Sequence, residues 1–219
     1  MKVKLGILFL CAAVLISGCR NKGTEASGAK EEAGKTMTKE EGKTMAEPTK
    51  PVVTGPTKVK LQTTMGDITI ELYEQKSPIT CANFLAYVKQ GFFDGTVFHR
   101  VRPKFMIQGG GMTANLVQKP TLAPIKNEST NGLKNDRGTI AMARTDNPDS
   151  ATSQFFINLV NNSFLDYASA AKPGYAVFGK VIEGMDVVDK IAAVQTTTKG
   201  MNQNVPVTPV IIQSAKIVP

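Results

Sequence analysis

The sequence predicts a mainly β fold in which short strands form a closed barrel capped at its ends by two helices. From residue 58 onward, short stretches of alternating apolar residues recur between Gly, Pro, Asn and Asp turn signals. Only two stretches have apolar residues at helical spacing. Residues 20–57 contain almost no large apolar side chains, so they cannot contribute to the core. We therefore expect one β domain over residues 58–219.

Composition limits the classes of function. A chain of 219 residues with 42% hydrophobic content has room for one ordinary domain and additional segments. The formal net charge is +8, but no basic run is interleaved with aromatic residues, so we expect no nucleic-acid partner. Its 3 cysteines do not suggest a disulfide framework, because each has a separate expected fate.

The N-terminus has the features of an export signal. Residues 1–18 combine a basic start, an apolar stretch over residues 5–16 and small residues before a cysteine. The segment LISGC resembles a bacterial lipobox, which implies that Cys19 is lipidated and becomes the mature N-terminus. We expect a lipid-anchored protein of the bacterial cell envelope, on the periplasmic or extracellular side. The alternative is a plain secretory signal with an incidental cysteine.

Residues 19–57 are expected to be the lipidated Cys19 followed by a disordered linker. The linker is rich in Lys, Glu, Gly, Thr, Ala and Pro. The sequence GKTM occurs twice, at residues 34–37 and 42–45. Neither copy has the upstream glycine of a phosphate-binding loop, so a nucleotide site is excluded.

The domain begins with a predicted hairpin and a helix. Residues 59–63 and 68–72 alternate as strands, with a turn at residues 65–67. Ser77 and Pro78 predict a helix start, with Ser77 as N-cap, and Gly91 predicts its end. Cys81 falls on the apolar face of this helix, where a buried thiol is expected.

The remaining elements follow from the same signals. A long loop is expected over residues 109–134, and the turn at residues 146–150 lacks the spacing of a calcium loop. The second helix is expected over residues 184–194, with Met185, Val188, Ile191 and Ala192 facing inward. Further strands are expected in these ranges: two within 97–108, then 138–143, 155–159, 175–181 and 207–217.

The most informative stretch is residues 98–111, which reads FHRVRPKFMIQGGG. Strand alternation predicts that Phe105 and Ile107 face one way, while Met106 and Gln108 face the other. His99 is the only histidine, and we interpret it as a partly buried, hydrogen-bonded side chain. Two downstream blocks, residues 138–158 and residues 164–181, accompany this stretch.

Together the three blocks resemble the signatures of the cyclophilins, the cyclosporin-binding family of peptidyl-prolyl cis-trans isomerases. The resemblance covers about residues 58–219. It implies an eight-stranded antiparallel barrel with a helix over each opening. It also implies an isomerase that accelerates X-Pro rotation in unfolded or exported proteins, acting as a monomer without a cofactor or metal.

The resemblance also implies a set of site residues. The catalytic positions are Arg100, whose guanidinium is the expected donor to the twisted prolyl nitrogen, and Gln108. An apolar socket for the proline ring is assigned to Phe105, Met106, Phe156 and Leu165. The further substrate-binding positions are Ala143, Arg144, Gln154, Phe164 and Tyr175.

Some positions depart from the vertebrate-type pattern. Phe164 stands where a tryptophan is expected, Tyr175 where a histidine is expected, and Arg144–Thr145 replaces Asn-Ala. These differences resemble the bacterial branch and imply weak cyclosporin binding. Two alternatives to the isomerase stay open: a proline-binding chaperone or adaptor that needs no turnover, and a barrel that serves only as a scaffold.

Overall fold

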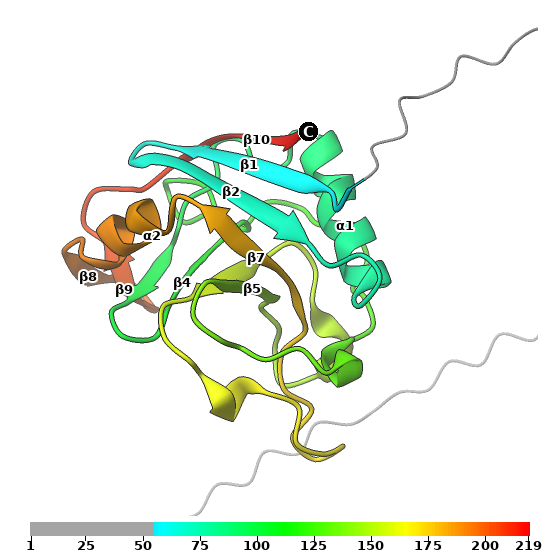
Figure 1. The fold of residues 1–219 in the computed structure, drawn as a ribbon. Coiled ribbons are helices and arrows are strands. Elements are labelled where there is room, and N and C mark those ends of the chain that lie inside the picture. The colour runs from blue at the N-terminus through cyan, green and yellow to red at the C-terminus, as the bar shows by residue number, and fades with distance from the viewer. Residues whose placement is uncertain (1–54) are drawn as a thin grey trace, which may run out of the picture. The chain divides into compact units, whose positions relative to one another are not determined.

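The computed structural model describes residues 55–219, which form a curved antiparallel sheet with two helices (Figure 1). The expected signal peptide, Cys19 and nearly all of the linker lie outside the described residues. The strands of the main sheet follow the order β10-β1-β2-β7-β5-β6-β4-β3. Their bounds are β1 Lys58–Thr63, β2 Gly66–Leu72, β3 Arg100–Arg102, β4 Met106–Gly109, β5 Thr139–Met142, β6 Phe155–Asn158, β7 Val177–Glu183 and β10 Ile212–Val218.

The eight strands form an open half-barrel, so the prediction of a closed barrel is wrong. The two edge strands, β3 and β10, do not form a ladder with each other. The segment before β3 instead meets the residues around the start of β10, through the isolated bridge between Val97 and Ile211 and a few backbone hydrogen bonds beside it.

The first helix, α1, spans Pro78–Lys89 with Ser77 at the N-cap position as predicted, but the Ser77 side chain makes no capping hydrogen bond. The Ser77 hydroxyl donates instead to the Val177 carbonyl at 2.8 Å. The Glu128 carboxylate accepts the N–H groups of Ile79 and Thr80 at 3.1 and 2.8 Å, so a distant loop satisfies this helix end. Cys81 is buried on α1, and burial raises the pKa of its thiol to about 12.

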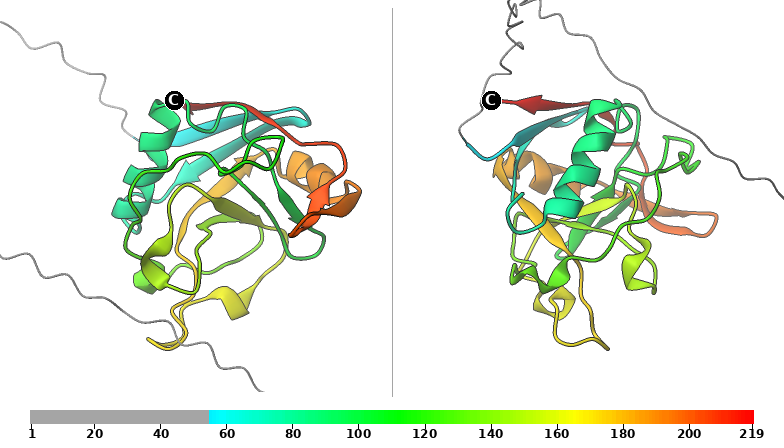
Figure 2. Two further views of the ribbon diagram at one scale, coloured as in Figure 1. Left: turned by 180° about the vertical axis from the view of Figure 1, so that it is seen from behind. Right: turned by 90° about the vertical axis from the view of Figure 1, so that its right-hand side faces the viewer.

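The second helix, α2, spans Met185–Ala192 and lies at the opposite end of the sheet from α1 (Figures 1 and 2). Val188 and Ile191 are fully buried as expected, and Val187 joins them. Met185 and Ala192 are only partly buried against the core. Among the described residues, no helix has the length and apolarity needed to cross a membrane.

The C-terminal region differs most from the prediction. The strand expected over residues 207–217 is confined to β10, and it is preceded by an unpredicted hairpin of β8 (Thr196–Lys199) and β9 (Asn202–Pro206). Strand β7 begins at Val177, two residues later than expected. The hairpin was missed because β8 is polar and largely exposed, and β9 is polar over its first three residues, with only Val205 and Pro206 buried.

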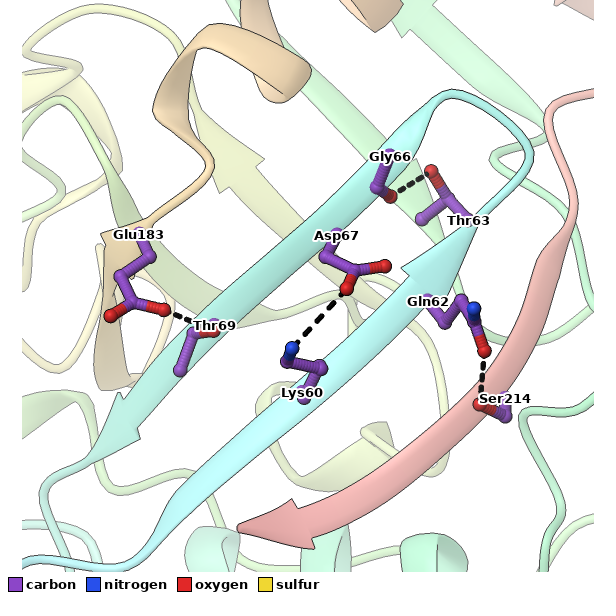
Figure 3. Close-up of polar contacts among 8 residues, drawn as sticks. All are labelled: Lys60, Gln62, Thr63, Gly66, Asp67, Thr69, Glu183 and Ser214. Atoms are coloured by element: carbon purple, nitrogen blue, oxygen red, sulfur yellow. Dashed lines mark hydrogen bonds and ion pairs between the residues drawn. The ribbon is translucent and has the colours of Figure 1, made fainter. Parts of the chain in front are cut away.

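The inner face of the sheet packs against the main core. The polarity of the outer face differs from one part of the sheet to another. At β10, β1 and β2 the outer face is polar (Figure 3). Lys60 pairs with Asp67 at 3.2 Å, and the Thr69 hydroxyl donates to Glu183 at 3.0 Å. The β1–β2 turn consists of two residues, Thr64 and Met65, because Thr63 pairs directly with Gly66.

Candidate active site

The outer face of β4, β5 and β6 carries a second hydrophobic cluster, separate from the main core. Met106, Ala141, Phe156 and Val177 form its buried centre. Their chain neighbours, such as Ile107 and Phe155, belong to the main core on the opposite face. Strand alternation therefore builds two buried clusters from the same strands, one on each face of the sheet.

A pocket of about 170 Å³ opens above this cluster. All of the site residues predicted from the sequence line it, except Gln154 and Phe164. Its lining is Arg100, Phe105, Met106, Gln108, Ala143, Arg144, Phe156, Leu165 and Tyr175. Hollows of about 660 and 600 Å³ elsewhere on residues 55–219 contain none of the predicted site residues.

Two side chains, Arg100 and Gln108, form the polar wall of the pocket, and a third supports them from behind. The Arg100 guanidinium donates to the Gln108 side-chain oxygen at 3.4 Å, and Gln108 donates to Gln154 at 2.9 Å. Arg100 and Gln108 face each other in register across β3 and β4. Gln154 thus acts behind the pocket wall rather than in it, and it holds the amide that orients the guanidinium.

The glycines after β4 make room for this arrangement. A Cβ on Gly111 would lie 2.4 Å from Cγ of Gln154, and one on Gly110 would lie 2.6 Å from the Phe155 ring. Gly110 also has φ +79°, which favours glycine. The glycine run therefore permits side chains of the site and the core to approach the backbone closely.

Aromatic rings and a second guanidinium form the rim. Phe164 is 73% exposed and stacks on Phe105, with ring centroids 5.6 Å apart. Phe105 lies just before β4 and reaches the pocket, so the expectation that it faces away from Met106 is wrong. The Arg144 guanidinium lies 4.5 Å from the Tyr175 ring centre, and its Nε donates to the Gly174 carbonyl at 3.0 Å.

A buried asparagine network, which sequence reasoning missed, fixes the backbone beneath the pocket. Asn162 donates to the Phe105 carbonyl at 2.9 Å and to the Asn158 side chain at 2.8 Å. Asn158 in turn donates to the Thr139 hydroxyl at 2.9 Å. The only indication in the sequence was the cluster of asparagines at and after the end of β6, and such a cluster is equally typical of a turn.

His99 is buried beside Arg100 but does not line the pocket. Its Nδ1 has no hydrogen-bond partner among the described residues, while Val97 and Gln154 make hydrogen-bond interactions with the ring. Burial lowers the pKa of His99 to about 4, so the ring is neutral at pH 7. Residues 55–219 contain no group of three or more His, Cys, Asp or Glu placed to hold a metal ion.

The site thus combines an antiparallel half-barrel, an apolar pocket floor and a guanidinium held on the pocket wall. The family model described as "Cyclophilin type peptidyl-prolyl cis-trans isomerase/CLD" matches residues 58–217. The chain belongs to this cyclophilin-type family.

Named relatives agree with this assignment. A peptidyl-prolyl cis-trans isomerase of Acinetobacter baylyi is 63% identical over 161 residues, covering 74% of this chain and 85% of the relative. Peptidyl-prolyl cis-trans isomerase B of Escherichia coli is 53% identical, covering 73% and 98%. A Cryptosporidium parvum cyclophilin-type isomerase structure is 27% identical, with a TM-score of 0.63, and covers 75% of this chain and 99% of that one.

Proposed function

We propose that this protein is a peptidyl-prolyl cis-trans isomerase that accelerates X-Pro rotation in exported proteins and so assists their folding. The barrier to this rotation is about 18–20 kcal/mol, because the amide is conjugated. An isomerase lowers the barrier by binding the twisted amide more tightly than either planar isomer. This reaction needs no nucleophile, metal or cofactor.

The observation that carries the proposal is the Arg100 guanidinium, held at the pocket by Gln108. As the amide twists, the prolyl nitrogen loses conjugation and gains a lone pair that can accept a hydrogen bond. A guanidinium remains charged at every physiological pH, so its N–H groups are always available. Arg100 would therefore stabilise the twisted state selectively, by preorganised electrostatics.

The rest of the pocket suits a proline and its flanking amides. Phe105, Met106, Phe156 and Leu165 offer an apolar socket of about 170 Å³ for the ring. Gln108 and the backbone at Arg144 would hold the peptide on either side of the turning bond. Fixing the flanking chain leaves the X-Pro bond as the part free to rotate.

We propose that the protein works as a monomer at the bacterial cell envelope, tethered by lipid on Cys19. A single acyl chain binds membranes only marginally, so the two or three chains of a bacterial lipoprotein would be needed. A flexible linker over residues 20–57 would give a root-mean-square reach of roughly 35 Å. The domain could then sample client chains near the membrane.

Arg100→Ala tests the enzymatic role. Loss of a donor used chiefly at the twisted state should lower kcat and kcat/KM together, by about 10²–10³-fold. The measurement is NMR exchange on one X-Pro peptide, with circular dichroism to confirm folding. Arg100→Lys is the matched variant, because it keeps the charge and loses the planar fork of donors. Near-wild-type exchange in Arg100→Ala would refute the mechanism.

The same assay distinguishes the alternative function. Phe164, exposed and stacked on Phe105 at the pocket, is suited to holding unfolded chains, as a chaperone or adaptor would. If the wild-type protein binds the peptide but never accelerates exchange, the chaperone or adaptor is the correct function.

Cys19→Ser tests the anchor. The variant should move from the membrane fraction to the soluble fraction, because the thiol that carries the lipid is gone. Cys11→Ser is the matched control and should remain in the membrane fraction, since Cys11 precedes the expected cleavage site. Retention of Cys19→Ser in the membrane pellet would contradict lipid anchoring.

A further inference from the structure

Four cationic side chains surround the proline pocket. Arg100 and Arg102 lie on β3, Lys104 lies in the turn between β3 and β4, and Arg144 follows β5. The strand order β5-β6-β4-β3 places β6 and β4, which supply the pocket floor, between Arg144 and the other three. A peptide lying across the pocket would therefore pass cations on both sides of its proline.

None of these four cations is neutralised by a carboxylate within 4.0 Å in the part of the chain that the structure describes. The ion pairs of that part are made by other cations instead. The carboxylates nearest to these cations in the sequence either bind other groups or make no ion pair with the four cations. Asp166 accepts the Asn135 N–H at 2.7 Å and pairs with Lys134, Asp149 accepts the Asn127 N–H at 2.8 Å, and exposed Asp146 contacts none of the four.

Two of the cations are held at the rim by aromatic rings that line the pocket. The Arg102 guanidinium lies 5.4 Å from the centre of the Phe105 ring, and the Arg144 guanidinium lies 4.5 Å from that of Tyr175. Cation–π contacts position each charge without neutralising it. Lys104 is exposed and has φ +60°, at the tip of the turn that carries Phe105.

We propose that this isomerase prefers X-Pro segments carrying acidic residues within about three positions of the proline. The proposal rests on the proposed isomerase function and names its substrate class. An extended chain advances about 3.3 Å per residue, so three positions reach about 10 Å, the range over which charges interact at 0.1 M salt. Acidic segments are attracted to the rim, whereas lysine-rich segments are repelled.

The test uses three peptides that differ only two positions before and two positions after one proline, with Glu, Gln or Lys at both places. NMR exchange gives the catalysed rate, and titration of the same samples gives the affinity. At about 0.02 M salt we expect kcat/KM for the Glu peptide to exceed that for the Gln peptide about fivefold, and the Lys peptide to fall below it. The ratio should approach one near 1 M salt.

The double variant Arg102→Gln, Lys104→Asn should reduce the Glu-to-Gln ratio to about half or less, with asparagine chosen because it tolerates the positive φ. The double variant Lys89→Gln, Lys216→Gln is the control for net charge, because it removes two charges at exposed positions of α1 and β10 that do not line the pocket, and it should keep the wild-type ratio. Equal rates and affinities for all three peptides, or an unchanged ratio in the double variant, would overturn the preference. Absence of catalysis on the Gln peptide would refute the isomerase function instead, and the affinity ratio would still decide the preference.

Discussion

The outer face of the sheet has two halves with opposite character. At β10, β1 and β2 it presents paired polar side chains such as Lys60 and Asp67, which remain in contact with water (Figure 3). At β5, β6 and β4 it presents Met106 and Phe156, which are buried beneath loops that carry Leu165 and Tyr175. The inner face is mainly apolar in both halves and belongs to the main core. The site is therefore found where the outer face of the sheet is apolar rather than polar.

Phe156→Ala compared with Lys60→Ala measures this difference most directly. Phe156 is 4% exposed, so truncation should lower the free energy of unfolding by about 3 kcal/mol. It should also weaken peptide binding, because the ring lines the pocket. Lys60→Ala removes only an exposed ion pair and should change stability by less than about 1 kcal/mol. Urea unfolding and peptide exchange check both variants; equal stability losses would show that the two halves do not differ.

His99, which precedes β3 in the half of the sheet that carries the site, should make the free energy of unfolding depend on pH. Its pKa is about 4 in the folded protein against 6.5 in the unfolded chain. Above pH 6.5 both states are neutral and the folded protein has its full stability. As the pH falls from 6.5 to 4, only the unfolded chain takes up a proton, so stability is lost by up to about 3 kcal/mol.

The measurement is urea unfolding between pH 4 and pH 7 for the wild type and His99→Gln. The variant has no imidazole to protonate, so its stability should fall less over this range. The difference between the two pH profiles removes the contribution of the carboxylates. Parallel profiles would contradict a neutral, buried His99.

Phe164→Trp should have the smallest effect, at the exposed rim of the pocket. Phe164 has no N–H to donate where the vertebrate-type tryptophan has one, so we expect the wild type to bind cyclosporin weakly. The variant should bind more tightly by about 1–3 kcal/mol, the usual value of one hydrogen bond to a buried partner. Inhibition titrations check this. Wild-type inhibition at low nanomolar cyclosporin would be inconsistent with it.

The sequence anticipated the strands and helices where local patterns were strong. The alternation of β1 and β2 and the helical spacing from Pro78 to Lys89 each have a local cause, and the structure has these elements. The polar hairpin of β8 and β9 lacks such a pattern and was missed. The cap of α1 was assigned to Ser77, because local capping by serine is the usual case, whereas Glu128 does it from 48 residues beyond Thr80.

The sequence by itself determined the family and the order of the strands along the chain, because motif and alternation are local properties of neighbouring residues. Only the tertiary structure decided that the half-barrel stays open, since that depends on how Val97 meets Ile211 across the molecule. It also decided the hydrogen-bond partners of Arg100 and Arg144, because the conformation of a long side chain depends on which residues the fold places beside it. Gly174 is the partner of Arg144, and Gln154 is linked to Arg100 through Gln108; no local pattern connects either residue to β3 or β5.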